Sequence, residues 1–148
     1  MKILIVEDDK LKIEQLANII TNTFHIEYLE KKYSFQSGMK EIKQNKYDLI
    51  ILDMSMPTFD ISPKNNCGPI MSFAGKEIMR QMKRKNIEAP VIVVTQYDTL
   101  GEKAIKLSQL NNELELKFGD FYLGVVYYDI TLENWKEDIV RVIKKVLK

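Results

Sequence analysis

The stretch YDLIILDMSMP, residues 47–57, ends a strongly apolar run in a carboxylate. The leucines and isoleucines at 49–52 are typical of a strand that helices cover on both faces of a sheet. Asp53 follows this run directly, and Pro57 comes shortly after it. A buried carboxylate is costly unless a cation or hydrogen-bond donors pair with it. The rest of the chain should therefore provide a partner for Asp53.

Short apolar runs alternate with segments of helical periodicity along the whole chain. The expected strands are residues 2–6, 25–32, 48–53, 89–97 and 121–128. The expected helices are a segment marked by Leu11, Ile13, Leu16, Ile19 and Ile20, then residues 34–45, 75–86, 99–118 (one long helix or a broken pair) and 131–148. This alternation predicts an α/β fold, a (βα)5 doubly wound parallel five-stranded sheet, with residues 1–148 forming a single domain.

Composition narrows the classes of function. The 148 residues are 45% hydrophobic and 29% charged, which is typical of a globular domain. Lys and Arg number 22 against 21 Asp and Glu, so the near-neutral charge gives no reason to expect binding to nucleic acid or to an acidic membrane. The single cysteine excludes an internal disulfide framework, and no long apolar segment is present. We therefore expect a cytoplasmic protein that does not span a membrane.

Acidic and hydroxyl side chains follow the ends of several expected strands. Glu7 and Asp8 come after residues 2–6, Asp53 ends residues 48–53, and Thr95 lies near the end of residues 89–97. In doubly wound sheets the functional crevice lies beyond the carboxyl ends of the strands. Carboxylates that converge there repel one another, and Mg²⁺ relieves this repulsion. A carboxylate beside Mg²⁺ is positioned to attack a phosphoryl donor.

These residues resemble the receiver domain of two-component response regulators, which has a flavodoxin-like fold. The segments ILIVEDD, YDLIILDMSMP and PVIVVTQYD occur in the family's order, and together they form a specific signature. The resemblance implies that Asp53 is the phosphoacceptor and that Thr95 is the switch hydroxyl that binds the phosphoryl group. It also implies a Mg²⁺ site formed by Asp53, Asp8, Glu7 through water, and the backbone carbonyl of Met54.

Three features depart from the family pattern, and the third is that the family's aromatic switch position on the fifth strand falls near Gly124, two residues from Tyr122. Tyr127 stands where the family has a lysine after the fifth strand, and Tyr128 stands where a proline usually follows. Lys117 is the nearest upstream lysine that could replace the missing one. It precedes the expected strand and would have to reach the site from a different element. The second departure is a long loop at about residues 58–73, which exceeds the usual length by about a dozen residues and could cover the site or bind a partner. A tolerated surface insertion is an equal alternative for this loop.

The sequence leaves more than one function open. The leading hypothesis is a stand-alone signalling receiver that takes a phosphoryl group on Asp53 from a sensor histidine kinase or another donor and signals to an effector protein or by self-association as a homodimer. Such a protein is not a turnover enzyme. The alternative is a phosphorylation-independent pseudo-receiver that acts as a protein-interaction module, which Tyr127 favours. A third hypothesis is a haloacid dehalogenase-like hydrolase that forms an aspartyl-phosphate. Such enzymes need a second acid two residues after the nucleophile, where this chain has Ser55, which argues strongly against this hypothesis.

Overall fold

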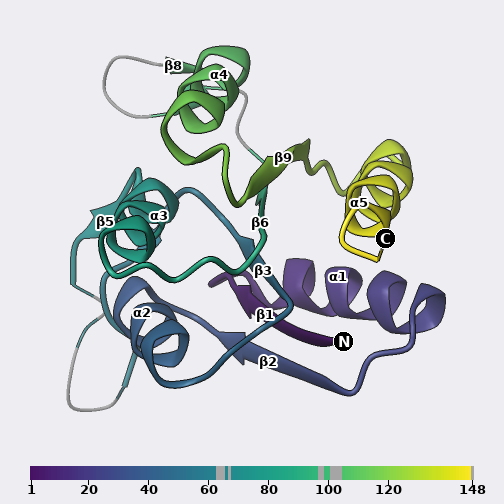
Figure 1. The fold of residues 1–148 in the computed structure, drawn as a ribbon, viewed down its shortest axis with the longest axis horizontal. Coiled ribbons are helices and arrows are strands. Elements are labelled where there is room, and N and C mark those ends of the chain that lie inside the picture. Colours follow the sequence, from purple (N-terminus) through teal and green to yellow (C-terminus); the bar gives the residue numbers. More distant parts are fainter. Residues whose placement is uncertain (63–65, 67, 97–98, 101–104, 148) are drawn as a thin grey trace.

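Five parallel strands form one sheet in the order β2-β1-β3-β6-β9 (Figure 1). The computed structural model describes residues 1–62, 66, 68–96, 99–100 and 105–147. The bounds of the sheet strands are β1 (Lys2–Val6), β2 (Tyr28–Lys32), β3 (Leu49–Leu52), β6 (Val91–Thr95) and β9 (Tyr122–Tyr127). The most apolar runs, β3 and β6, are fully buried, as a strand covered on both faces should be.

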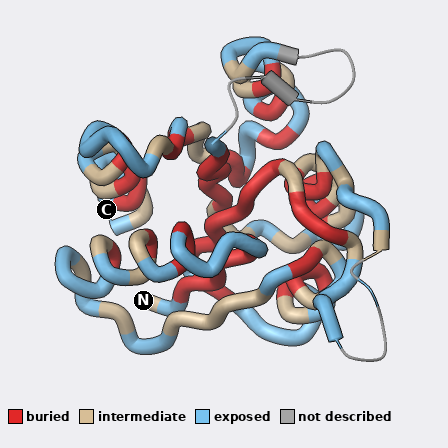
Figure 2. Tube along the Cα trace, turned by 180° about the vertical axis from the view of Figure 1, so that it is seen from behind, coloured by how far each residue is buried: buried red, intermediate tan, exposed pale blue. Residues whose placement is uncertain are grey.

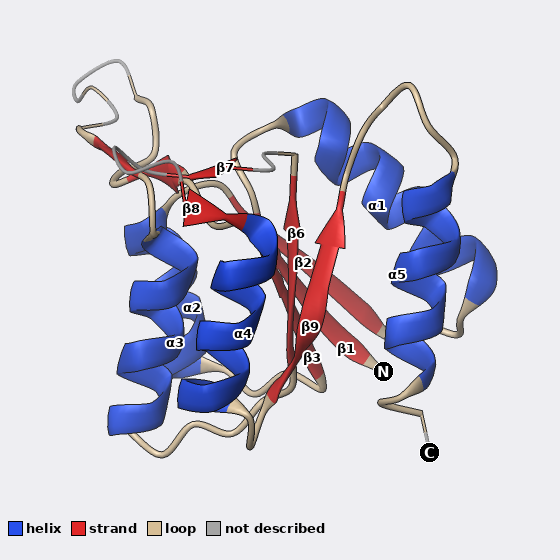
Figure 3. Ribbon diagram, turned by 90° about the horizontal axis from the view of Figure 1, so that it is seen from above, coloured by secondary structure: helices blue, strands red, loops and turns tan. Residues whose placement is uncertain are grey.

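Helices cover both faces of this sheet (Figure 3). Helices α1 (Lys10–Thr23) and α5 (Asn134–Lys144) lie on one face. Helices α2 (Phe35–Gln44), α3 (Ala74–Arg84) and α4 (Leu107–Phe118) lie on the other. The (βα)5 doubly wound prediction is therefore confirmed. No helix within the described ranges has both the length and the apolar character needed to cross a membrane.

Alternate residues of each strand feed two separate cores, one on each face of the sheet. Along β1, Ile3 and Ile5 pack with α1 and α5, whereas Leu4 and Val6 pack with the opposite helices. The buried residues concentrate along the central strands and the inner faces of the helices (Figure 2). Since neither face of the sheet is free, the functional crevice is confined to the ends of the strands.

The expected long loop begins and ends in a short antiparallel pair. Strand β4 (Met56–Pro57) pairs with β5 (Ile70–Met71). The hydroxyl of Thr58 donates to the carbonyl of Pro69 at 2.6 Å, which closes the segment at its base. Its described residues include exposed apolar side chains, among them Ile61 with 81% of its surface accessible.

The expectation of helix from residue 99 was wrong for the part that the structure describes before Leu107. Strand β7 (Thr99–Leu100) pairs with β8 (Ile105–Lys106) in an antiparallel ladder, and α4 begins only at Leu107. Thr99 and Ile105 are β-branched and favour strand, and Gly101 disfavours a continuous helix in this sequence. The expected helical residues 101–104 lie outside the described part of the chain.

Candidate functional site

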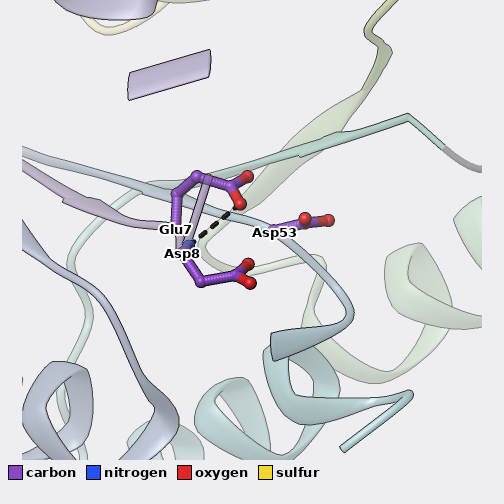
Figure 4. Close-up of side chains that lie close together, drawn as sticks. All are labelled: Glu7, Asp8 and Asp53. Atoms are coloured by element: carbon purple, nitrogen blue, oxygen red, sulfur yellow. Dashed lines mark hydrogen bonds between the residues drawn. The ribbon is translucent and has the colours of Figure 1, made fainter. Parts of the chain in front are cut away.

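Three carboxylates converge where β1 and β3 end (Figure 4). Glu7 and Asp8 follow β1, and Asp53 follows the neighbouring strand β3. The two strands are parallel, and their last paired residues are Val6 and Leu52. The amide of Asp53 donates to the carbonyl of Val6 at 3.1 Å and continues this pairing beyond the strands. One oxygen from each carboxylate lies within 4.8 Å of the others. The structure thus brings together the three acidic side chains predicted from the sequence.

The turn after β1 fixes the acids at the start of α1. Glu7 Oε2 accepts hydrogen bonds from the amides of Asp8 and Asp9, both at 3.0 Å. Asp9 caps α1 by accepting from the amides of Leu11 and Lys12 at 3.0 and 3.3 Å. Such a cap satisfies amides that have no partner inside the helix. Asp9 is therefore engaged in forming the helix, while Glu7 and Asp8 remain at the crevice.

A buried lysine that sequence reasoning missed lies among these acids. The Lys12 ammonium Nζ is 2.5 Å from Glu7 Oε1 and 3.3 Å from Asp53 Oδ2. It also donates to the backbone carbonyl of Val94 at 2.8 Å. The Lys12 side chain is 1% exposed, and of the lysines in the described ranges it alone contacts Asp53. The expectation that a metal ion is the partner of Asp53 is therefore incomplete, because the chain supplies its own cation.

Aromatic side chains close the space around this ammonium. The ring centroid of Tyr128 lies 5.4 Å from Lys12 Nζ, a distance typical of a cation–π contact. The Tyr128 hydroxyl donates to Gln15 at 2.6 Å, and its ring packs edge-on against Trp135 with centroids 4.9 Å apart. These contacts tie the ammonium to α5 as well as to α1, so the lysine is held from several sides.

The signal for Lys12 was present in the sequence. Lys12, Leu16 and Ile20 are spaced four residues apart, so they share one stripe of α1, and all three are buried. Leu11 was expected on the apolar face, but its side chain is 51% exposed. A lysine at the end of an apolar stripe, five residues after an acid that ends a strand, is the pattern that could have revealed this pairing.

The backbone next to Asp53 is closely packed. Asp53 Oδ1 accepts from the amide of Met54 at 2.7 Å, and the Met54 carbonyl accepts from the amide of Gly75 at 3.1 Å. A Cβ atom on Gly75 would lie 2.7 Å from the carbonyl oxygen of Asp53. Glycine is therefore required for α3 to begin this close to the acceptor. The role of the Met54 carbonyl as a metal ligand stays a prediction.

Thr95 ends β6 beside the acids and is fully buried. Leu52 pairs with Val93, so continuing this register places Asp53 beside Val94, one residue before Thr95. Thr95 in turn pairs with Tyr127, the last residue of β9, whose side chain is 41% exposed. The role of Thr95 as a switch remains a prediction.

Lys117 does not act as the cation of this site. It lies on α4, where its ammonium pairs with Glu113 at 2.9 Å, and it is about half exposed. No residue of β9 is a lysine. Among the described residues, Lys12 on α1 is therefore the cation that meets the acceptor carboxylate.

Burial governs the electrostatics of the site. Burial raises the pKa of the Glu7 carboxyl above its usual value; Asp53 adds to this effect and the Lys12 ammonium opposes it. Three carboxylates facing one ammonium leave an excess of negative charge. Carboxylate oxygens are the ligands that Mg²⁺ prefers, so the donor set formed by Glu7, Asp8 and Asp53 fits that ion.

Comparison with known proteins places this geometry in a family. The model of the response regulator receiver domain matches residues 3–112. The chain is 32% identical over 150 residues to the Detocs response regulatory protein DtcB of Enterobacter cloacae (strain JD6301), covering 99% of this chain and 100% of the relative. It is 33% identical over 144 residues to the uncharacterized protein y4jR of Sinorhizobium fredii (strain NBRC 101917 / NGR234), covering 94% of each.

Solved structures agree on the fold. A DNA-binding response regulator of the LuxR family from Staphylococcus aureus superposes with a TM-score of 0.68 at 19% identity, covering 99% of this chain and 98% of that one. The Francisella response regulator 1452 receiver domain superposes with a TM-score of 0.67 at 20% identity, covering 98% of this chain and 95% of that one. The match to the family model and the similarity to DtcB over the whole chain agree with the acidic residues at the ends of β1 and β3. They show that the chain belongs to the family of response regulator receiver domains.

Proposed function

We propose that this protein is a phosphorelay receiver that accepts a phosphoryl group on Asp53 in the presence of Mg²⁺ and signals through a partner protein. The observation that carries the proposal is the position of Asp53. Its side chain is 5% exposed, it ends a central strand, and its carboxylate faces those of Glu7 and Asp8. A buried carboxylate in an acidic cluster suits acceptance of a phosphoryl group better than it suits a purely structural role.

The chemistry at Asp53 is a direct displacement. A carboxylate oxygen of Asp53 attacks the phosphorus of the donor and forms a new O–P bond, while the bond from phosphorus to the leaving group breaks. With an acyl phosphate as donor, the leaving carboxylate takes the electron pair and no proton moves. The Lys12 ammonium lies 3.3 Å from Asp53 Oδ2, beside the oxygens that react.

Glu7, Asp8 and Asp53 would hold the metal ion. When bound, Mg²⁺ supplies charge that neutralises the oxygens of the transferring phosphoryl group. Glu7 keeps Oε2 on the amides of Asp8 and Asp9, so its other oxygen faces Lys12 and the crevice. The Met54 carbonyl is a further candidate ligand, since its bond to Gly75 leaves one lone pair. Thr95, buried at the end of β6, is the candidate hydroxyl for a phosphoryl oxygen.

The partners follow from this chemistry. A sensor histidine kinase or another phosphodonor protein would supply the phosphoryl group, and an effector protein would read the change. A reducing compartment such as the cytoplasm suits a chain with one cysteine.

A second candidate function is a phosphorylation-independent interaction module. The observation that favours it is the ion pair of Lys12 with Glu7 and Asp53, which satisfies the buried acids without metal or phosphate. In this reading the acidic site is structural, and the segment between β4 and β5, whose described residues include the exposed Ile61, carries recognition.

The test is the intact mass of the purified protein after incubation with Mg²⁺ and acetyl phosphate. Phosphorylation predicts an increase by one phosphoryl group that is absent from Asp53→Asn and present in Asp138→Asn. The control residue lies on α5 and pairs with Arg141 at the surface. No adduct on a protein that is folded by circular dichroism would contradict the receiver proposal and favour the interaction module.

A further inference from the structure

The Lys12 ammonium contacts the acceptor carboxylate of Asp53 as well as the carboxylate of Glu7. A buried charge costs several kcal/mol of desolvation unless its partners compensate. Lys12 is 1% exposed, and its ammonium lies 2.5 Å from Glu7 Oε1 and 3.3 Å from Asp53 Oδ2. A buried cation in contact with the reacting carboxylate is positioned for a role in the reaction in addition to its structural role.

The end of β9 provides no cation that could share this role. The strand ends in Tyr127, a side chain 41% exposed that carries no positive charge. The phosphoryl group brings two negative charges and three acceptor oxygens into a site that is already acidic. Within the described ranges, the cation able to meet them comes from the opposite side of the acceptor strand, from α1.

We infer that Lys12 is the residue whose ammonium pairs with the phosphoryl group on Asp53, so that α1 supplies the cation that β9 lacks. This inference rests on the proposed function. An ammonium carries three N–H donors, which in this structure face Glu7 Oε1, Asp53 Oδ2 and the carbonyl of Val94. Phosphorylation turns the Asp53 carboxylate into an acyl phosphate, in which one oxygen bridges to phosphorus, the other is a carbonyl oxygen, and phosphoryl oxygens lie beside them. The donor that faces Oδ2 then moves to a phosphoryl oxygen, while the Val94 bond keeps Nζ in place.

Mg²⁺ and the Lys12 ammonium would then have different roles at the site. The carboxylates of Glu7 and Asp8 serve the metal, whereas Lys12 serves the transferred group through a hydrogen bond and its charge. Because Lys12 repels a nearby divalent ion, removing its charge should strengthen metal binding at the same time as it weakens phosphorylation. A residue that only kept the site folded would weaken both.

The first experiment compares wild type, Lys12→Met and Lys117→Met. Phosphorylation by acetyl phosphate with saturating Mg²⁺ is followed by intact mass, and Mg²⁺ binding is followed by calorimetry without donor. Lys12→Met should be phosphorylated about 10- to 100-fold more slowly, which is the effect of losing a hydrogen bond to a charged group. It should bind Mg²⁺ about tenfold more tightly. Lys117→Met, which alters a lysine paired with Glu113 at the surface, should match wild type in both.

The second experiment uses the wild-type protein and does not depend on whether Lys12→Met folds. The side-chain ¹⁵N signal of Lys12, assigned with Lys12→Arg, is recorded with Mg²⁺ alone and after addition of fluoroberyllate, which mimics a phosphoryl group on a carboxylate. Pairing with the phosphoryl group predicts that this signal shifts on addition of fluoroberyllate while the signal of Lys117 does not.

The outcomes separate the two proposals. Phosphorylation of Lys12→Met at the wild-type rate, or a Lys12 signal that fluoroberyllate leaves unchanged, overturns the inference and leaves the receiver function standing. Failure of wild type itself to accept a phosphoryl group overturns both. Slow phosphorylation of Lys12→Met with tighter Mg²⁺ binding, together with the shifted signal, supports the inference.

Discussion

Replacing Lys12 by Met should strongly destabilise the protein in the absence of divalent ions. Methionine keeps an unbranched apolar side chain but removes the ammonium that lies 2.5 Å from Glu7 Oε1. Both side chains of this pair are at most 3% exposed, so solvent cannot replace the lost partner. Removing one member of a buried ion pair costs about 3–5 kcal/mol, because the other charge is left uncompensated. A domain of this size has about 5–15 kcal/mol of stability, so the loss is readily measured.

Two further measurements locate the origin of that cost. Adding Glu7→Gln to Lys12→Met removes the buried acid that would otherwise keep an unpaired charge or take up a proton, so the double variant should be more stable than Lys12→Met alone. Mg²⁺ should also restore stability to Lys12→Met, by about 2.7 kcal/mol at a hundred times its dissociation constant. Both effects follow from the same excess of negative charge around Asp53.

The assay is urea unfolding followed by far-ultraviolet circular dichroism, once with EDTA and once with Mg²⁺. Lys117→Met serves as the control, because that lysine is about half exposed and Glu113 retains Lys76 as a second partner. The control should unfold at nearly the wild-type urea concentration. A loss below about 1 kcal/mol for Lys12→Met in EDTA would refute the reasoning, since it falls within the range of an exposed pair. A double variant less stable than Lys12→Met would refute it as well.

Three other predictions test the surroundings of the site. Gly75→Ala should cost about 1–3 kcal/mol in thermal unfolding and slow phosphorylation of Asp53, because its Cβ would lie 2.7 Å from the Asp53 carbonyl oxygen. Asp9→Ala should cost about 1 kcal/mol in urea unfolding through loss of the α1 cap, with Asp9→Asn close to wild type. Burial and the bond to Glu41 raise the pKa of Tyr47, so the folded protein holds this proton more tightly than the unfolded chain. Stability should therefore fall as the pH rises above about 10, and Tyr47→Phe should reduce that fall in unfolding measured against pH.

The central strands of the sheet could be predicted because they are apolar on both faces. The runs at residues 2–6 and 48–53 correspond to β1 and β3 within a residue or two at each end. Acidic residues directly after these runs identified Glu7, Asp8 and Asp53 as neighbours, since parallel strands bring their carboxyl ends to one edge. Here the sequence is informative because strand ends and helix starts leave local signals.

The antiparallel pair of β7 and β8 and the position of Lys12 were not predicted, for different reasons. A two-residue strand leaves almost no periodic signal, so the residues before Leu107 were grouped with the helix that follows them. Lys12 was overlooked because a lysine on a helix is most often a solvated residue. Its burial depends on acids from β1 and β3, and such a partnership between distant segments becomes visible only when the strands are assembled.

The presence of Lys12 and the absence of a lysine in β9 are two aspects of one electrostatic requirement. Glu7 and Asp53 are 2% and 5% exposed, and two buried carboxylates need a positive partner whether or not metal is bound. A chain whose β9 ends in Tyr127 has to obtain that charge from another element, and α1 begins directly beside the acids. Lys12 is then the partner that makes a buried Asp53 tolerable and, among the described residues, the cation that contacts its carboxylate. Losing this one ammonium should therefore affect folding and phosphorylation together, whereas the loss of Lys117 should affect neither.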